Sequence, residues 1–251
     1  MMPRLKPYNR KSYEPKKAAL AAQRRRRYHQ PTMKNLSLIA LPALLSLPLH
    51  AAPPLTLTEL GGGTPAMPSP LSSSVVVIID AQREYVDGRL PLAGVAAALR
   101  QSQRLLARAR AAGVPVIHIQ QVSKPGRGIF DPTGPFVAFA PEAQPLDGEK
   151  IVHKLLPNAF AGTTLDEVLK KLGRKDLILS GYMTHMCVSA TARAAFDLGY
   201  KTTVIADACA TRDLPDGFGG TLAAADIHRI ALAELADRFS TVVSTLDEIP
   251  D

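Results

Sequence analysis

Three side chains that could do chemistry together follow three separate apolar runs of the sequence. Cys187 opens an alanine-rich helical stretch within residues 181–188, GYMTHMCV. Asp80 follows the run VVVII, and Lys154 follows the run IVH. Backbone N–H groups at a helix start favour the thiolate, so this position predicts that the pKa of Cys187 is lowered from about 8.5. A thiol nucleophile, a carboxylate base and an ammonium group would together support nucleophilic catalysis.

The elements that must position these side chains are predicted by an alternation of short apolar runs with helical periodicity. Each predicted strand is apolar throughout, so both of its faces must be buried. The pattern predicts a single α/β domain with a doubly wound, Rossmann-like and mostly parallel sheet that has helices on both faces. Ligands of such sheets bind at the carboxyl ends of strands, where the three side chains are expected. The predicted strands cover residues 75–79, 114–119, 151–153, 177–179, 202–206 and 241–243, and the helices cover residues 95–109, 165–172, 187–198 and 223–238.

Each of the three residues also has a simpler interpretation when it is taken alone. A lone cysteine beside valine and alanine is usually a core residue, and a lone aspartate after a strand usually caps the next turn. A lone lysine is usually a solvated charge. The occurrence of all three at strand ends favours catalysis, because burying either charge without the other would be costly. A redox or structural pairing of Cys187 with Cys209, the second cysteine of the sequence, is an alternative.

Four short motifs close predicted strands. They are Asp80-Ala81-Gln82, Lys154 followed by PNAF at residues 157–160, THMCV at residues 184–188, and Asp207-Ala208. In this order the motifs resemble those of the isochorismatase-like cysteine hydrolases, the superfamily that includes nicotinamidases and N-carbamoylsarcosine amidase. The likeness covers about residues 74–245, which is nearly the whole predicted domain.

The resemblance implies a role for each of the three residues. Cys187 would attack a carbonyl carbon, Asp80 would take the thiol proton and pass it to the leaving amine, and Lys154 would hold both in their charged states. The peptide between Tyr182 and Met183 would be cis and would turn the N–H groups of Met183 and Cys187 toward the oxyanion. Further candidates, for substrate binding, are Gln82, Tyr85 and Phe160.

The expected reaction is hydrolysis of a C–N bond in a small-molecule amide, imide or carbamoyl group through a thioester on Cys187. A vinyl ether hydrolase of the isochorismatase type needs no thiol, and a non-catalytic binding protein on the same scaffold is a further alternative. We expect no cofactor. We also expect no metal, because residues 121–153 lack the Asp-x-His cluster of the nicotinamidase branch.

The charge of the chain is concentrated in its first 52 residues. Of the 30 Lys and Arg and 22 Asp and Glu in the chain, eleven basic residues and one acidic residue lie there, a net charge of +10 within a total of +8. The remainder is near neutral, which argues against a nucleic-acid partner. Residues 33–52 read as a signal peptide, which predicts a periplasmic or secreted protein without stable membrane insertion once the signal is removed. A basic tail on a cytoplasmic protein is the alternative.

Two further segments have distinct compositions. Residues 53–73 are rich in Pro, Gly, Ser and Thr and read as a linker ahead of a domain at residues 74–251. The predicted long loop at residues 121–149 carries three phenylalanines that would line a pocket or pack against a neighbouring subunit. By resemblance we expect a homo-oligomer.

Overall fold

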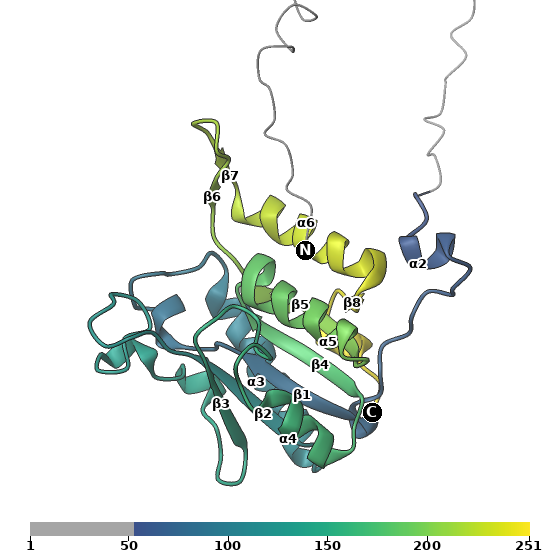
Figure 1. Ribbon diagram of the computed structural model, residues 1–251, viewed down its shortest axis with the longest axis horizontal. Helices are drawn as coiled ribbons and strands as arrows, with labels where there is room; N and C mark the ends of the chain where they lie inside the picture. The colour runs from purple at the N-terminus through teal and green to yellow at the C-terminus, as the bar shows by residue number, and fades with distance from the viewer. Residues whose placement is uncertain (1–52) are drawn as a thin grey trace, which may run out of the picture. The chain divides into compact units, whose positions relative to one another are not determined.

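The computed structural model describes residues 53–251, and the expected signal peptide lies outside the described residues. Its central sheet has six strands in the order β3-β2-β1-β4-β5-β8, and every neighbouring pair is parallel. These strands are β1 (Ser74–Ile79), β2 (Val116–Gln121), β3 (Lys150–Lys154), β4 (Asp176–Tyr182), β5 (Lys201–Ala210) and β8 (Thr241–Val243). Figure 1 shows them side by side. The doubly wound parallel sheet predicted from the sequence is confirmed.

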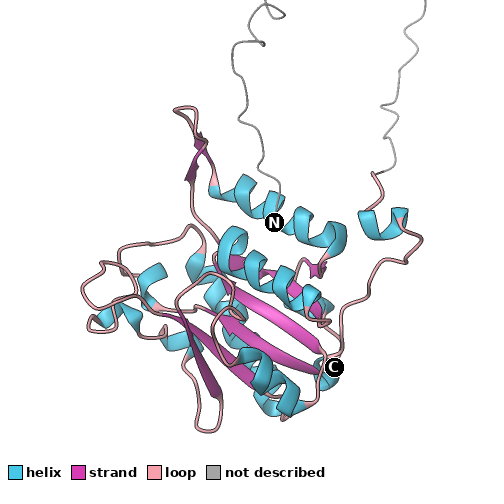
Figure 2. Cartoon of the chain, viewed as in Figure 1, coloured by secondary structure: helices cyan, strands magenta, loops and turns pink. Residues whose placement is uncertain are grey.

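Helices cover both faces of the sheet (Figure 2). Apolar side chains of α3 lie in one buried cluster, whereas those of α4, α5 and α6 lie in the other. The four helices are α3 (Val95–Ala111), α4 (Leu165–Leu172), α5 (Ser189–Asp197) and α6 (Ala224–Arg238). Alternate residues of β1 divide between the two clusters, with Ile78 on the α3 side and Ile79 on the other. A strand with two dry faces needs an uninterrupted apolar run, which is why its sequence does not alternate.

The order of the strands reverses between β1 and β4. The chain builds β1, β2 and β3 outward in one direction and then crosses back to place β4 on the other side of β1. Loops diverge at such a switch point and leave a crevice at the carboxyl ends of the two strands. Asp80 follows β1 and Cys187 lies five residues after β4, so the fold brings both to the switch point between these strands.

The segment ahead of β1 is packed on the domain, although its composition reads as a linker. It contains the short helix α2 (Leu57–Leu60), whose first N–H group donates to Oδ1 of Asp237 at 2.7 Å. Closer to β1, Ser69 is fully buried and its hydroxyl donates to Oδ1 of Asp176 at 2.6 Å. Pro and Gly predict the absence of long regular elements, but they do not predict whether a segment packs. We call residues 55–67 the strap.

Two further observations complete the fold. After β5 the chain forms a small antiparallel hairpin from β6 (Leu214–Pro215) and β7 (Thr221–Leu222), which projects from the domain in Figure 1. Within residues 53–251, no helix combines the length and the apolar character needed to cross a membrane.

Candidate active site

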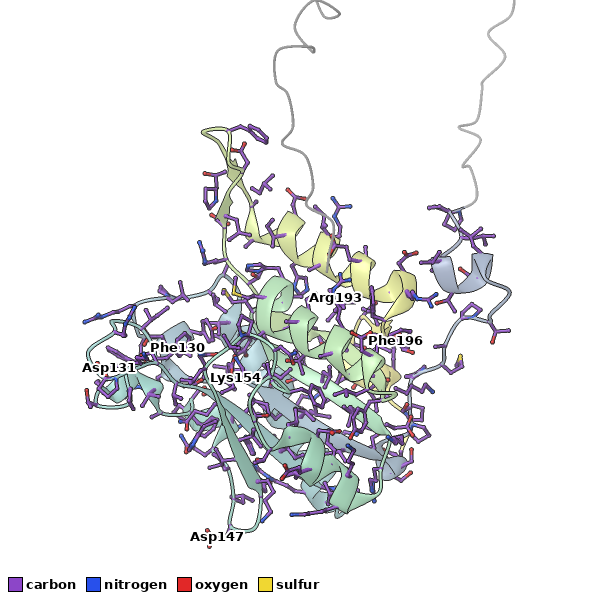
Figure 3. All side chains as sticks on the ribbon, in the orientation of Figure 1. Phe130, Asp131, Asp147, Lys154, Arg193 and Phe196 are labelled. Carbon is purple, nitrogen blue, oxygen red and sulfur yellow. The ribbon has the colours of Figure 1, made fainter. Side chains whose placement is uncertain are left out.

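The three side chains singled out in the sequence meet at the carboxyl edge of the sheet. Nζ of Lys154 lies 2.8 Å from Oδ2 of Asp80 and 3.3 Å from Sγ of Cys187. Figure 3 labels Lys154 at the centre of the domain. Asp80 and Lys154 are at most 1% exposed, and Cys187 is 4% exposed. The lysine reaches its partners from β3 across the end of β2. Residues far apart in the chain therefore form one buried cluster of acid, ammonium and sulfur.

Asp80 adopts an unusual backbone conformation. Its φ is +53°, in the left-handed region that aspartate tolerates better than most residues, and its N–H donates to the carbonyl of Ile119 at 3.0 Å. Nζ of Lys154 lies 2.8 Å from Oδ2 of Asp80, and the charge of Lys154 together with hydrogen bonds from Lys154, Cys187 and Gln121 favours the ionised carboxyl group.

Gly181 allows β4 to approach β1 closely beside the site. Its φ is +132°, and a Cβ atom at this position would lie 2.0 Å from the carbonyl oxygen of Ile79. The pairing of β4 with β5 also shifts register between Leu179 and Gly181. Any side chain at residue 181 would push apart the ends of β1 and β4, which precede Asp80 and the turn that carries Cys187.

Cys187 lies on a turn of π-helix, Thr184–Val188, rather than on the first turn of the predicted α-helix. Such wide turns occur often at functional sites. Two polar contacts hold the turn: Thr184 Oγ1 shares a hydrogen bond with Nδ1 of His228 at 2.9 Å, and Nδ1 of His185 shares one with Oγ1 of Thr211 at 2.5 Å. The turn is thereby tied to both α6 and the end of β5.

The peptide bond between Tyr182 and Met183 is cis, as the resemblance implied. Met183 is buried and directly precedes the π-helical turn. Its carbonyl accepts hydrogen bonds from the N–H groups of Met186 and Val188 at 3.0 and 3.2 Å.

Burial determines the protonation of the resting site. It raises the pKa of Cys187 to about 12, and the charge of Asp80 adds to this rise while Lys154 opposes it. The expectation that a helix start lowers the thiol pKa is wrong for this site, because the desolvation of the buried sulfur outweighs the favourable charges. Burial also raises the pKa of Asp80, against the opposing effect of Lys154. Burial thus disfavours the charged form of both groups, and the neighbouring ammonium of Lys154 favours it in both.

Gln121 is a site residue that the sequence reasoning missed. Its Oε1 accepts a hydrogen bond from Nζ of Lys154 at 2.5 Å, which fixes the ammonium group between its two partners. Gln121 ends β2, the strand between those that carry Asp80 and Lys154. The rule that placed the other three residues, a polar side chain at a strand end, applies to Gln121 as well.

The three predicted substrate-binding residues have different surroundings. Gln82 is fully buried, and its amide bonds only to backbone: Nε2 donates to the carbonyls of Gln121 and Val137, and Oε1 accepts from the N–H of Gln121. Tyr85 is buried in the cluster on the α3 side and meets Tyr182 edge-on. Phe160 is half-buried and packs on the opposite cluster. Gln82 thus joins two strand ends, and Tyr85 is a core residue.

The long loop after β2 is fixed against the segment that follows Asp80. Buried Glu84 accepts hydrogen bonds from the N–H groups of Phe130 and Arg89, at 2.9 and 2.7 Å. Two of the three loop phenylalanines are buried: Phe130 lies edge-on to Tyr85, and Phe139 lies edge-on to His118. These two rings pack the loop onto the domain.

Both cysteines are free thiols, and Cys209 is buried in β5, where it pairs with Gly181 of β4. Within residues 53–251, no group of three or more His, Cys, Asp and Glu is arranged to hold a metal ion. The structure therefore does not contain the Cys187–Cys209 pairing that was the alternative to catalysis.

Comparison with known proteins identifies the class to which this fold and site belong. The Isochorismatase domain model matches residues 74–247, and the chain belongs to the isochorismatase family of hydrolases. A solved isochorismatase structure from Pseudomonas putida KT2440 is 43% identical and superimposes with a TM-score of 0.74, over 77% of this chain and 98% of that chain.

Three curated relatives show the range of the family. The secreted isochorismatase effector Isc1 of Verticillium dahliae is 38% identical over 74% of this chain and 95% of its own. Streptothricin hydrolase of Streptomyces noursei is 33% identical over 70% of this chain and 73% of its own. Ureidoacrylate amidohydrolase RutB of Variovorax paradoxus is 27% identical over 73% of this chain and 84% of its own.

Proposed function

We propose that the protein hydrolyses a C–N bond in a small amide, imide or carbamoyl compound, with Cys187 as nucleophile, Asp80 as proton carrier and Lys154 as the charge that holds them together. The observation that carries this proposal is the convergence of acid, ammonium and sulfur within about 3.3 Å of Nζ of Lys154. A cysteine, an acid and a lysine buried in contact match the requirements of thiol catalysis, because the nucleophile needs a base and the base needs a fixed position.

The first half of the reaction forms a thioester. Asp80 takes the thiol proton as the sulfur attacks the carbonyl carbon. A base is needed because a thiol whose pKa is about 12 releases almost no proton to solvent at neutral pH. The oxyanion would accept hydrogen bonds from the backbone N–H groups of Met183 and Cys187, each donor contributing about 3 kcal/mol. When the intermediate collapses, the C–N bond breaks and Asp80 returns the proton to the leaving nitrogen.

The second half returns the enzyme to its starting state. Asp80, again a carboxylate, removes a proton from water as the water oxygen attacks the thioester carbonyl. The C–S bond breaks, the acid product leaves, and the proton passes to the sulfur of Cys187. Throughout the cycle Lys154 remains an ammonium whose position is set by Gln121.

The names of two relatives favour cleavage of two different types of bond. The name of RutB specifies an amidohydrolase, which favours C–N cleavage, whereas the name of Isc1 specifies an isochorismatase and favours cleavage of a vinyl ether. We favour C–N cleavage because a vinyl ether needs no thiol, while this chain holds a buried thiol against an acid and an ammonium group.

A substrate screen separates these functions. Small amides, ureas and imides would be tested beside isochorismate, with wild type and Cys187→Ser in parallel. Amide, urea or imide hydrolysis that disappears in Cys187→Ser is the expected result. Isochorismate turnover that persists in Cys187→Ser would instead assign the vinyl ether reaction. Tight retention of a compound without turnover of any compound would assign a binding protein.

Export and assembly belong to the same proposal. We infer that residues 33–52 are a cleaved signal peptide ahead of a hydrolase domain at residues 74–251, and that the mature protein is a homo-oligomer. The secreted relative Isc1 supports export. Amino-terminal sequencing of the natural protein should find a mature start near residue 53, and a start far upstream would contradict export. Sedimentation equilibrium measures the oligomeric state, and a monomer would contradict assembly.

A further inference from the structure

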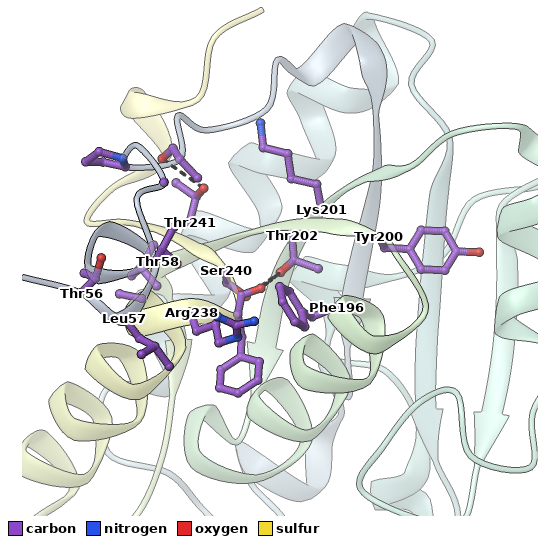
Figure 4. Close-up of a pocket in the computed structure, with 17 residues that line it drawn as sticks. Thr56, Leu57, Thr58, Phe196, Tyr200, Lys201, Thr202, Arg238, Ser240 and Thr241 are labelled. Carbon is purple, nitrogen blue, oxygen red and sulfur yellow. Dashed lines mark hydrogen bonds between the residues drawn. The ribbon is translucent and has the colours of Figure 1, made fainter.

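A cavity lies at the opposite edge of the sheet from Cys187. It has a volume of about 580 Å³ and is bordered by the strap, by the ends of α5 and α6, and by the first residues of β5 and β8 (Figure 4). These are the amino ends of the strands, whereas the catalytic cluster occupies the carboxyl ends. Its volume lies within the range of small-molecule sites, roughly 300–1,000 Å³.

The wall formed by the strap is attached to the domain by specific hydrogen bonds. The carboxylate of Asp237, at the end of α6, accepts from the N–H of Leu57, and its carbonyl accepts from the hydroxyl of Thr58. At the other end of the strap, Thr241 Oγ1 donates to the carbonyl of Ala66 at 3.2 Å. The strap thus encloses a defined space while leaving the side chain of Leu57 half-exposed beside it.

The opposite wall is aromatic and basic. Phe196 and Phe239 meet edge-on at 5.5 Å, and the guanidinium of Arg238 lies 5.6 Å from the ring centroid of Phe196. Among residues 53–251, neither Arg238 nor the other cation of the lining, Lys201, has an ion-pair partner.

The nearby charges of opposite sign are already engaged. Asp237 caps the strap helix, and Glu59 accepts hydrogen bonds from the N–H and hydroxyl of Thr56. Arg193, the other basic residue against these rings, is paired with Glu234. Arg238 therefore lies beside the ring of Phe196 and is not ion-paired with any of these carboxylates.

We propose that this cavity binds a small molecule with one anionic group and an apolar body, of the size of a medium-chain or aryl carboxylate, at a site separate from the catalytic cluster. The anion pairs with Arg238, with Lys201 at the rim. The apolar body covers Phe196 and the exposed face of Leu57, which gain burial when the space is filled.

Fluorescence titration of the whole chain with 1-anilinonaphthalene-8-sulfonate tests the site, because this probe has a single anion on an aromatic body. We expect saturable binding to one site, displacement by decanoate and no displacement by the uncharged 1-decanol. Arg238→Gln should weaken binding about tenfold or more, as expected for loss of a hydrogen bond to a charged group. Lys201→Gln should weaken it less.

Two control variants separate this site from the rest of the molecule. Arg229→Gln removes another cation of α6. Arg229 does not line the cavity and pairs with Asp226, so this change should leave binding unchanged. Cys187→Ser should leave it unchanged as well. Absence of saturable binding, equal loss in Arg238→Gln and Arg229→Gln, or equal displacement by decanol and decanoate would each overturn the proposal. None of these results depends on whether the catalytic proposal holds.

Discussion

The two edges of the sheet treat charge in opposite ways. At the carboxyl edge, Asp80 and Lys154 are almost fully buried and lie 2.8 Å apart. At the amino edge, Arg238 is exposed and has no ion-pair partner among the described residues. Burying an ion pair costs desolvation free energy that can exceed the attraction between the two charges, so this pair is weak evidence for stability. An open, unmatched cation costs little and remains free to meet a mobile anion. The comparison therefore agrees with the two proposals, catalysis at the carboxyl edge and ligand binding at the amino edge.

The strongest test of this division is removal of the thiol that we propose as nucleophile. Cys187→Ala should lower turnover at least about a thousandfold, because no other group can form the thioester, while the protein remains folded. Turnover of the substrate found in the screen and a circular dichroism melt measure the two effects. Cys209→Ser is the matched control and should retain activity. Full turnover by Cys187→Ala would refute its role.

A second test disturbs the approach of β4 to β1. Gly181→Ala should destabilise the fold by about 3 kcal/mol or more, because its Cβ would lie 2.0 Å from the carbonyl oxygen of Ile79. Gly173→Ala is the control, since Gly173 also has a positive φ, +67°, but has nothing within 4 Å of a Cβ atom. That change should cost only about 1 kcal/mol. Urea unfolding measures both, and equal losses would mean that the close contact is unimportant.

A third test concerns the group that positions the ammonium. Gln121→Leu removes the acceptor 2.5 Å from Nζ of Lys154 and should lower turnover roughly ten- to hundredfold. Gln121→Glu restores an acceptor at the same distance and should recover part of the loss. The rate of alkylation of Cys187 by iodoacetamide should change in Gln121→Leu, since the lysine would no longer be fixed beside the sulfur. Unchanged turnover and alkylation would contradict a positioning role.

The smallest expected effect is a change in stability at acid pH, and it concerns the ion-paired carboxylate of Glu149. Glu149 accepts hydrogen bonds from Arg110 and from the N–H of Leu146, and it shares one with His118. Burial raises the pKa of Glu149, but the hydrogen bonds outweigh burial and lower the pKa from 4.5 to about 2. A carboxylate with a lowered pKa in the folded state stabilises the protein above about pH 4.5. This contribution is lost as the pH falls toward 2. Glu149→Gln should therefore reduce the pH dependence of the unfolding free energy between pH 4.5 and 2. An unchanged slope would remove Glu149 from this account.

The sequence predicted the position of the site more completely than its protonation. Strand ends are readable because a buried parallel strand needs an unbroken apolar run, so Asp80, Lys154 and Cys187 could be assigned to one edge before any geometry was known. The direction of the thiol pKa was predicted wrongly. It depends on how much solvent reaches the sulfur, and burial of this kind arises from elements distant in sequence.

Other features escaped prediction for local reasons. The π-helical turn at Thr184–Val188 has the composition of an ordinary helix start, and it is fixed by contacts from Thr211 and His228 far along the chain. Gln121 resembles many polar residues that end strands, and its role follows only from its contact with Lys154. The packing of the strap also depends on partners such as Asp237, which its own composition does not reveal.

Lys154 is carried by β3, the outermost strand of the sheet, which has a neighbour on one side only. The exposed residues of β3 include Ile151, so β3 buries little apolar surface against the domain. Strands of this kind detach at lower free-energy cost than central strands. When β3 detaches, the ammonium leaves while Asp80 and Cys187 stay on the central strands. Catalytic competence should thus report on the most weakly held part of the sheet and be lost on mild denaturation before the rest of the domain unfolds.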